Sequence, residues 1–241
     1  MPNSQQIAWK RLLAEGVAII VSILLAFGID AWWENRQERT EEQQILQGLN
    51  EEFSLIREVL TRHKQIHLGR LQALEDLLAA FDVDKSKRTV EVVAAALDEL
   101  LAPTTSDISN GTLRALLSSG RLEIIENIRL RELLVGWETA IEEVWDDQQS
   151  MAKLVYEIHV PYFIGEGYGV GEVVDIWYSE NTAPVRSIGE DMAEVGRLLN
   201  DPRFQSMVEH RYLYKLHLTD EFENAIAAAA AILAEIDKSI S

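Results

Sequence analysis

The chain contains no cysteine among its 241 residues, so disulfides, thiolate catalysis and zinc sites built on sulfur are excluded. Basic residues are also scarce: 22 Lys and Arg stand against 40 Asp and Glu, giving a formal charge of −18. Within residues 1–33 the charges of Lys10 and Arg11 balance those of Glu15 and Asp30, so the excess lies on the remainder. Because an acidic body repels nucleic acid and anionic headgroups, we expect neither as its partner.

Proline is absent from the stretch Glu34–Phe81, which contains only two glycines. Apolar residues recur there at spacings of three and four, which predicts one long helix with a coiled-coil-like seam. The predicted seam comprises Leu46, Leu49, Phe53, Ile56, Leu60, Leu71, Leu74, Leu78 and Phe81.

A single long apolar run, Leu12–Ala31, stands near the start of the chain. Its length is about that of a helix crossing the hydrocarbon core of a bilayer. Lys10 and Arg11 precede it, and Trp9 and the pair Trp32 and Trp33 bracket it, as interfacial anchors do. We therefore predict a short tail and transmembrane anchor over residues 1–33 and an acidic extramembrane domain over residues 34–241.

A cleaved signal peptide is the alternative interpretation, with Ala26-Phe27-Gly28 as a small-residue cleavage site. The helical pattern continues past the apolar run without a breaker, which favours a signal anchor. Arg36 and Arg39 follow the run closely, so the local count of basic residues is tied across it. We expect the N-terminus in the cytoplasm and the large domain in the periplasm, because long domains translocate largely regardless of charge.

Small residues form a stripe along the predicted span, at Ala14, Ala18, Ser22 and Ala26. Such a stripe lets a second transmembrane helix approach closely; an ordinary lipid-facing surface is the alternative. Glu15 lies four residues after Arg11, so an interfacial ion pair is the simplest interpretation of it, and a proton or ligand role is the alternative.

His63 and His67 interrupt the predicted seam at a spacing that places both on one helix face. Two such histidines can bind a metal. No carboxylate-and-His pairing of a di-iron bundle accompanies them, and Arg62 and Lys64 would repel a cation. A polar layer within the seam is therefore the favoured interpretation.

The pattern in the rest of the chain also predicts helices joined by turns, so we predict an all-α fold. In this fold an N-terminal transmembrane helix continues into the long coiled-coil-like helix, and the extramembrane part forms an antiparallel helical bundle. Two tryptophans, Trp137 and Trp145, are expected as core anchors of the long helix that begins at Ile128. The predicted elements are a turn at 82–87, a helix at 89–101, a connector at 103–111, a short helix at 112–118 capped by Gly120, a long helix from Ile128 to near Pro161, a helix at 189–199, and a last helix opening at Asp201 and Pro202.

Residues 159–186 break the helical pattern and predict an irregular insertion. Its alternating glycines match neither a dinucleotide fingerprint nor a phosphate-binding loop. A crossover loop is one interpretation, and a docking surface carrying Tyr168, Trp177 and Tyr178 is the other. The glycines are Gly165, Gly167, Gly169 and Gly171.

Two segments carry a resemblance. Glu15–Asn35 combines a Glu, an apolar run and a Trp followed by charged residues, and Thr112–Trp137 contains a Leu-x-x-Ser-Gly-x-Leu segment, an Asn and an amphipathic helix. Both resemble the hallmarks of a family of bacterial single-span membrane proteins of unknown function. A third segment, Asp201–Ile236, resembles the terminal helix of that family. The resemblance implies a bacterial inner-membrane anchor and a helical domain, and it implies no activity.

We expect a non-catalytic membrane-anchored scaffold, or an accessory or assembly subunit of a membrane protein complex. Its expected partners are the lipid bilayer and either a membrane protein or a second copy of the chain. The span and the long helix are expected to make the protein contacts. The alternative is a periplasmic ligand-binding sensor that signals through a partner protein, since only about eleven residues precede the span. No cofactor is expected. An enzyme is least favoured, because Ser118-Ser119-Gly120 reads as a helix cap and the histidines form no catalytic motif. These are His63, His67, His159, His210 and His217.

Overall fold

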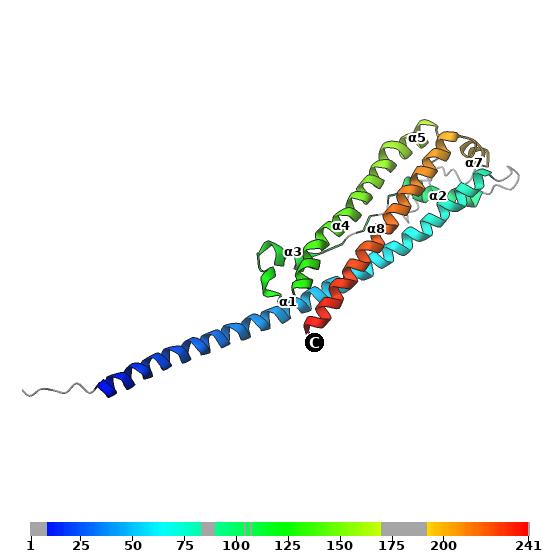
Figure 1. Cartoon of the computed structure of the whole chain (residues 1–241). Coiled ribbons are helices and arrows are strands. Elements are labelled where there is room, and N and C mark those ends of the chain that lie inside the picture. Colours follow the sequence, from blue (N-terminus) through cyan, green and yellow to red (C-terminus); the bar gives the residue numbers. More distant parts are fainter. Residues whose placement is uncertain (1–8, 83–89, 104, 107, 170–191, 241) are drawn as a thin grey trace, which may run out of the picture.

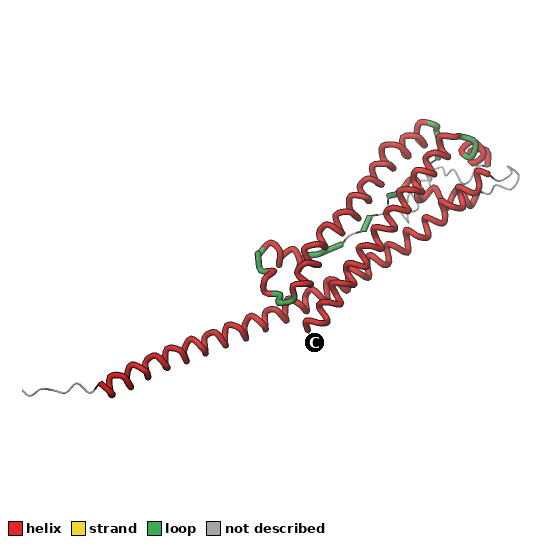
Figure 2. The backbone as a smooth tube through the Cα atoms, in the orientation of Figure 1, coloured by secondary structure: helices red, strands yellow, loops and turns green. Residues whose placement is uncertain are grey.

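The computed structural model describes residues 9–82, 90–103, 105–106, 108–169 and 192–240. Within these ranges every regular element is helical and no strand occurs, which confirms the all-α prediction (Figure 2). The predicted turn at 82–87 lies outside the described residues beyond Asp82, as does the start of the helix predicted at 189.

The longest element is α1, Trp9–Asp82, which confirms the unbroken helix predicted for residues 34–81 and extends it back through the apolar run. With a rise of 1.5 Å per residue its 74 residues measure about 110 Å. Its N-terminal part projects as a single helix, and the other helices gather along its C-terminal part (Figure 1).

The bundle is built on α1, α8 (Pro202–Ile240) and α4 (Ile128–Leu154). α8 runs antiparallel to α1, because Asn50 contacts Asp237 near the C-terminus whereas Lys64 pairs with Glu223 further back. α4 packs against α8. Asp201 caps α8 as predicted, with Oδ1 accepting the backbone N–H of Arg203 at 2.8 Å.

Shorter helices complete the bundle: α2 (Val90–Leu101), α3 (Gly111–Ser118), the 3₁₀ turn η2 (Leu122–Ile124), the π turn η3 (Val155–His159), α5 (Val160–Gly165) and α7 (Met192–Leu198). The predicted left-handed cap of α3 is confirmed, since Gly120 has φ +69°. At its other end, Glu52 of α1 accepts the N–H groups of Thr112 and Leu113, which ties α3 to α1.

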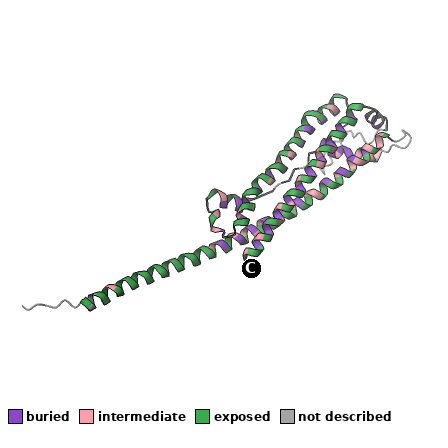
Figure 3. Cartoon of the chain, in the orientation of Figure 1, coloured by how far each residue is buried: buried purple, intermediate pink, exposed green. Residues whose placement is uncertain are grey.

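The core falls into two apolar clusters along the bundle axis. The first contains the predicted seam from Leu46 to Leu60 together with Trp137 and the C-terminal half of α8; Trp145 packs against it half-buried. The second joins Leu74, α2, Phe163 and the start of α8. Their burial contrasts with the exposed N-terminal arm in Figure 3.

The long helix predicted to end near Pro161 instead continues to Gly165 through the π turn. Pro161 has no N–H to bond the carbonyl of Glu157, and its ring would clash there, so the helix widens. The extra residue rotates the following side chains. Ile158, predicted on the apolar face, is therefore 51% exposed, and His159 is buried in its place.

The insertion predicted at 159–186 is wrong at its start. Residues 159–165 are helical, and Tyr168 closes the turn by donating its N–H to the carbonyl of Phe163. Gly167 has φ +72°, a conformation that favours glycine. The rest of the predicted insertion, including Gly171, Trp177 and Tyr178, lies outside the described residues.

Candidate functional site

The first candidate site is the projecting arm of α1. It contains a segment long and apolar enough to cross a membrane, and none of that segment is buried against the chain. Leu24, Leu25 and Phe27 are all exposed there. A soluble helix with this composition would bury such side chains, so a surrounding medium or a partner must cover them.

The predicted anchors lie at both ends of this segment. Trp9 is 71% exposed, and Trp32 and Trp33 are exposed with ring centroids 6.4 Å apart. The guanidinium of Arg36 lies 5.6 Å from the centroid of Trp32, which places a cation beside the aromatic pair. The side chains of Lys10 and Arg11 are outside the described part.

The predicted small-residue stripe lies on the exposed surface of the arm, at Ala18, Ser22 and Ala26. The Ser22 hydroxyl donates to the carbonyl of Ala18 at 2.8 Å, so its polar group is satisfied within the helix. Glu15 is exposed, and the side chain of Ala14 is not described.

A polar stalk separates the apolar segment from the bundle. Residues Glu34–Arg39 are exposed, and the tertiary contacts begin at Arg39, whose Nη2 lies 3.9 Å from Glu126 Oε1, and continue over the next turn. There Glu41 pairs with Arg121, and the Glu42 carboxylate accepts the N–H of Glu126 at 2.7 Å. The bundle therefore begins about two turns beyond the apolar segment.

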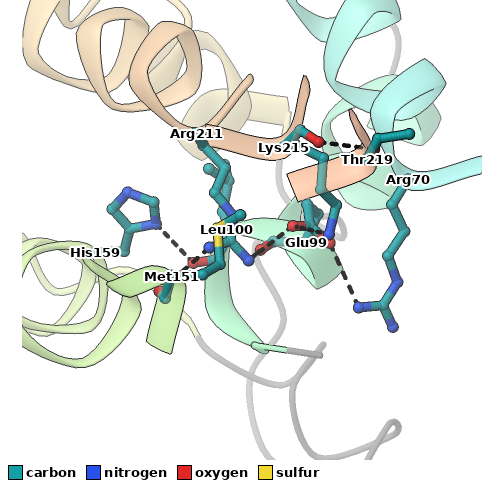
Figure 4. Close-up of polar contacts among 8 residues, drawn as sticks. All are labelled: Arg70, Glu99, Leu100, Met151, His159, Arg211, Lys215 and Thr219. Carbon is teal, nitrogen blue, oxygen red and sulfur yellow. Dashed lines mark hydrogen bonds and ion pairs between the residues drawn. The ribbon is translucent and has the colours of Figure 1, made fainter. Parts of the chain in front are cut away.

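The second candidate site is a buried ionic layer between the two apolar clusters. Glu99 of α2 and Arg211 and Lys215 of α8 are all 0% exposed. Arg211 Nη2 and Lys215 Nζ each lie 2.7 Å from Glu99 Oε1, and Arg70 Nη1 lies 3.4 Å from Oε2 (Figure 4). Three cations from two helices thus surround one carboxylate.

The layer also completes the C-terminus of α2, whose last carbonyls have no partner inside the helix. Arg211 Nη2 donates to the carbonyl of Glu99 at 2.7 Å, and His159 Nδ1 lies 2.8 Å from the carbonyl of Leu100. A cation at this end is stabilised by the helix dipole. α2 is therefore held in place by α8 and the π turn.

Burial dominates the titration of this layer. It lowers the pKa of Lys215 to about 8 against the opposing effect of Glu99, and it lowers the pKa of Arg211. It also lowers the pKa of His159 to about 4 and that of His67 to about 2, the latter with help from Lys215. Both histidines are neutral at pH 7.

The two seam histidines lie beside this layer. His67 is buried with its ring 5.0 Å from that of Phe222, and His63 stacks on the same ring at 6.3 Å. No group of three or more His, Cys, Asp or Glu that could hold a metal occurs within the described ranges. His63 and His67 thus both lie in the seam against the ring of Phe222.

The remaining predicted residues do not gather into one site. Tyr168 is half-buried against Tyr162 and Phe163, with Arg197 5.3 Å from its ring centroid. His217 lies on the exposed surface near Asp147, with Nε2 3.4 Å from Oδ2.

An open groove lies between the end of α4 and α8, with a volume of about 430 Å³. We call it the α4–α8 groove; its walls are Leu154, Ile158, His159, Ser206, Met207, Glu209, His210 and Leu213.

Neither this groove nor the ionic layer was expected from the sequence. The available signal was that Arg211 and Lys215 continue the three-and-four spacing of the apolar residues of α8, from Val208 to Leu218.

No protein family, no curated protein and no solved structure matches the chain.

Proposed function

We propose that the protein is a non-catalytic membrane-anchored scaffold, an accessory or assembly subunit of a membrane complex. It presents the helical bundle in the bacterial periplasm, with its N-terminus in the cytoplasm. The observation that carries this proposal is the continuity of α1, which passes unbroken from the exposed apolar segment into the bundle core.

The continuity matters because it joins two environments through one rigid element. Leu46, Leu49 and Phe53 are fully buried in the bundle, whereas Leu24 and Leu25 on the same helix touch nothing in the bundle. A flexible tether would leave the bundle orientation undefined, but a helix transmits orientation. This arrangement suits a subunit that holds a partner at a fixed height and angle.

The exposed arm also supports a helical partner in the lipid. Between transmembrane helices the lipid supplies no hydrophobic drive, so close approach of backbones becomes important. Ala18 and Ser22 offer such an approach on one face of the arm. The acidic bundle, carrying the charge excess, disfavours binding to anionic lipid directly.

The test is the native mass of the full chain, purified from membranes in mild detergent and measured by light scattering. We expect an oligomer or a complex with a co-purifying membrane protein. A lone monomer of 27.3 kDa with no co-purifying protein would contradict the proposal.

A matched pair of variants locates the contact. Ala18→Leu fills the stripe, and Ala31→Leu makes the same change about 140° around the helix. We expect Ala18→Leu to reduce the assembled fraction and Ala31→Leu to leave it unchanged. Equal effects would place the contact away from the stripe.

Topology can be tested cleanly because the chain has no native cysteine. Ser54→Cys places a thiol on the exposed surface of the bundle, and Ser4→Cys places one before the arm. With a membrane-impermeant maleimide on intact spheroplasts, we expect Ser54→Cys to label and Ser4→Cys to label only after lysis. The opposite pattern would reverse the proposed orientation.

A second candidate, a ligand-binding sensor that signals through a partner, is favoured by the α4–α8 groove. Its volume lies within the range of small-molecule sites. A rise in melting temperature with a small-molecule panel would support this candidate, because a ligand bound only to the native state stabilises it.

A further inference from the structure

The α4–α8 groove has one unusual wall, the π turn Val155–His159. Its wide hydrogen bond runs from the N–H of Val160 to the carbonyl of Val155, five residues apart. π turns are rare and concentrate at functional sites. Here the turn faces His159 into the chain and leaves Ile158 on the outer rim.

The hydrogen bond of His159 fixes its tautomer. Nδ1 lies 2.8 Å from the carbonyl oxygen of Leu100, which can only accept, so Nδ1 carries the proton. Burial lowers the pKa of the ring to about 4, so His159 is neutral at pH 7 and Nε2 presents a lone pair.

That lone pair has no hydrogen-bond partner among the described residues, although the ring is fully buried. Nε2 lies on the opposite side of the ring from Leu100 (Figure 4). A buried acceptor without a donor is costly, and such groups are rare in native proteins. The site therefore lacks one donor.

Apart from Ser206, Glu209 and His210, the rest of the groove lining is apolar. Leu154 and Met207 form its inner wall, and Ile158 and Leu213 lie exposed at its rim. His210 stands beside it with its ring 5.1 Å from that of Tyr214. These walls suit an uncharged body, and the strongly acidic chain disfavours an anion.

We propose that the α4–α8 groove binds a small, uncharged, mainly apolar molecule that donates one hydrogen bond, through a hydroxyl or ring N–H, to Nε2 of His159. Nε2 itself is covered in the structure, so binding requires a side chain to shift. Met207 has three rotatable bonds and is the most adaptable side chain of the wall. This inference goes beyond the scaffold proposal and holds independently of it, whereas the sensor candidate depends on it.

The probes are indole and 1-methylindole, which share a ring system but differ in the N–H donor. Binding is measured by calorimetry on the full chain in lipid nanodiscs, with empty nanodiscs subtracted to remove partition into lipid. We expect indole to bind at least about tenfold more tightly, which corresponds to one net hydrogen bond.

A matched pair of variants tests the location. Ser206→Trp fills the groove from its exposed rim, and Ser54→Trp makes the same change on a distant exposed face of α1. We expect Ser206→Trp to abolish the preference for indole and Ser54→Trp to retain it. Both positions are exposed, so folding is expected to survive, and far-ultraviolet circular dichroism checks it.

Nitrogen NMR of the imidazole rings gives a second readout. We expect indole to move the Nε2 resonance of His159 and 1-methylindole to leave it in place. Equal binding of both probes, no saturable binding of indole, or an unchanged preference in Ser206→Trp would overturn the inference. The native mass of the complex tests the scaffold proposal separately, so the two failures are distinguishable.

Discussion

Removing the central carboxylate of the ionic layer is the sharpest test of how the bundle is held together. Glu99→Gln keeps the size of the side chain and one acceptor oxygen but deletes the carboxylate charge that lies 2.7 Å from both Arg211 Nη2 and Lys215 Nζ. Both cations are 0% exposed, so water cannot replace the lost partner.

The expected cost follows from the chemistry of the two cations. Lys215 can become neutral by losing its proton. For an amine of ordinary pKa, deprotonation at pH 7 costs at most about 4.6 kcal/mol of free energy. Arg211 cannot deprotonate, and it keeps its hydrogen bond to the carbonyl of Glu99. Breaking a buried pair typically costs about 3–5 kcal/mol, a large part of the stability of a domain.

The assay is urea unfolding of the full chain in detergent, followed by far-ultraviolet circular dichroism at pH 7. Glu58→Gln is the matched control, because Glu58 pairs with Arg62 on the surface and such pairs contribute about 0–1 kcal/mol. Adding Lys215→Met to Glu99→Gln removes the stranded amine, and we expect it to recover part of the loss. A Glu99→Gln protein within about 1 kcal/mol of the original chain would refute the reasoning.

Three further outcomes are expected in the same unfolding assay. Because burial lowers the pKa of Lys215 to about 8, the unfolded chain binds more protons than the folded chain from pH 8 to 10. The free energy of unfolding should therefore rise over that range, and Lys215→Met should flatten the rise. Gly120→Ala should destabilise by about 1 kcal/mol because φ is +69°, whereas Gly136→Ala in open space on α4 should stabilise by a similar amount; the reverse order would contradict the backbone argument. Trp137→Ala, which removes a buried ring 5.1 Å from that of Phe53, should cost about 3–5 kcal/mol and clearly more than Trp145→Ala.

Periodicity was sufficient to predict most of the architecture. The spacing from Leu46 to Leu60 identified a buried face correctly, and Gly120 and Asp201 marked helix ends through local backbone and capping chemistry. These features are local: each depends on residues within a few positions of one another, which a sequence displays directly.

The ionic layer could not be predicted in the same way. Glu99 lies 112 positions before Arg211, and its neighbours on α2 show nothing that requires a cation. Lys215 resembles any surface lysine unless its place in the apolar spacing of α8 is noticed. Whether such a charge is buried depends on which helices meet, and that is a property of tertiary packing.

The π turn shows a different limit. Pro161 announces a disturbance of the helix, and the sequence-based expectation was that the helix ends there. Packing of Phe163 in the second cluster instead favours continuation, so the helix absorbs the proline by widening. That local accommodation moved His159 inward and Ile158 outward, and it created the groove.

The unbroken course of α1 makes it a lever arm. From Trp33 to Asp82 the helix measures about 75 Å, so leaning the apolar segment by about 10° swings the far end sideways by roughly 13 Å. Transmembrane helices lean by differing amounts as bilayer thickness changes. With the apolar segment in a bilayer, as proposed above, a thinner or thicker membrane would therefore sweep the distal end of the bundle, where α5 and α7 lie (Figure 1), through an arc comparable to the diameter of a helix.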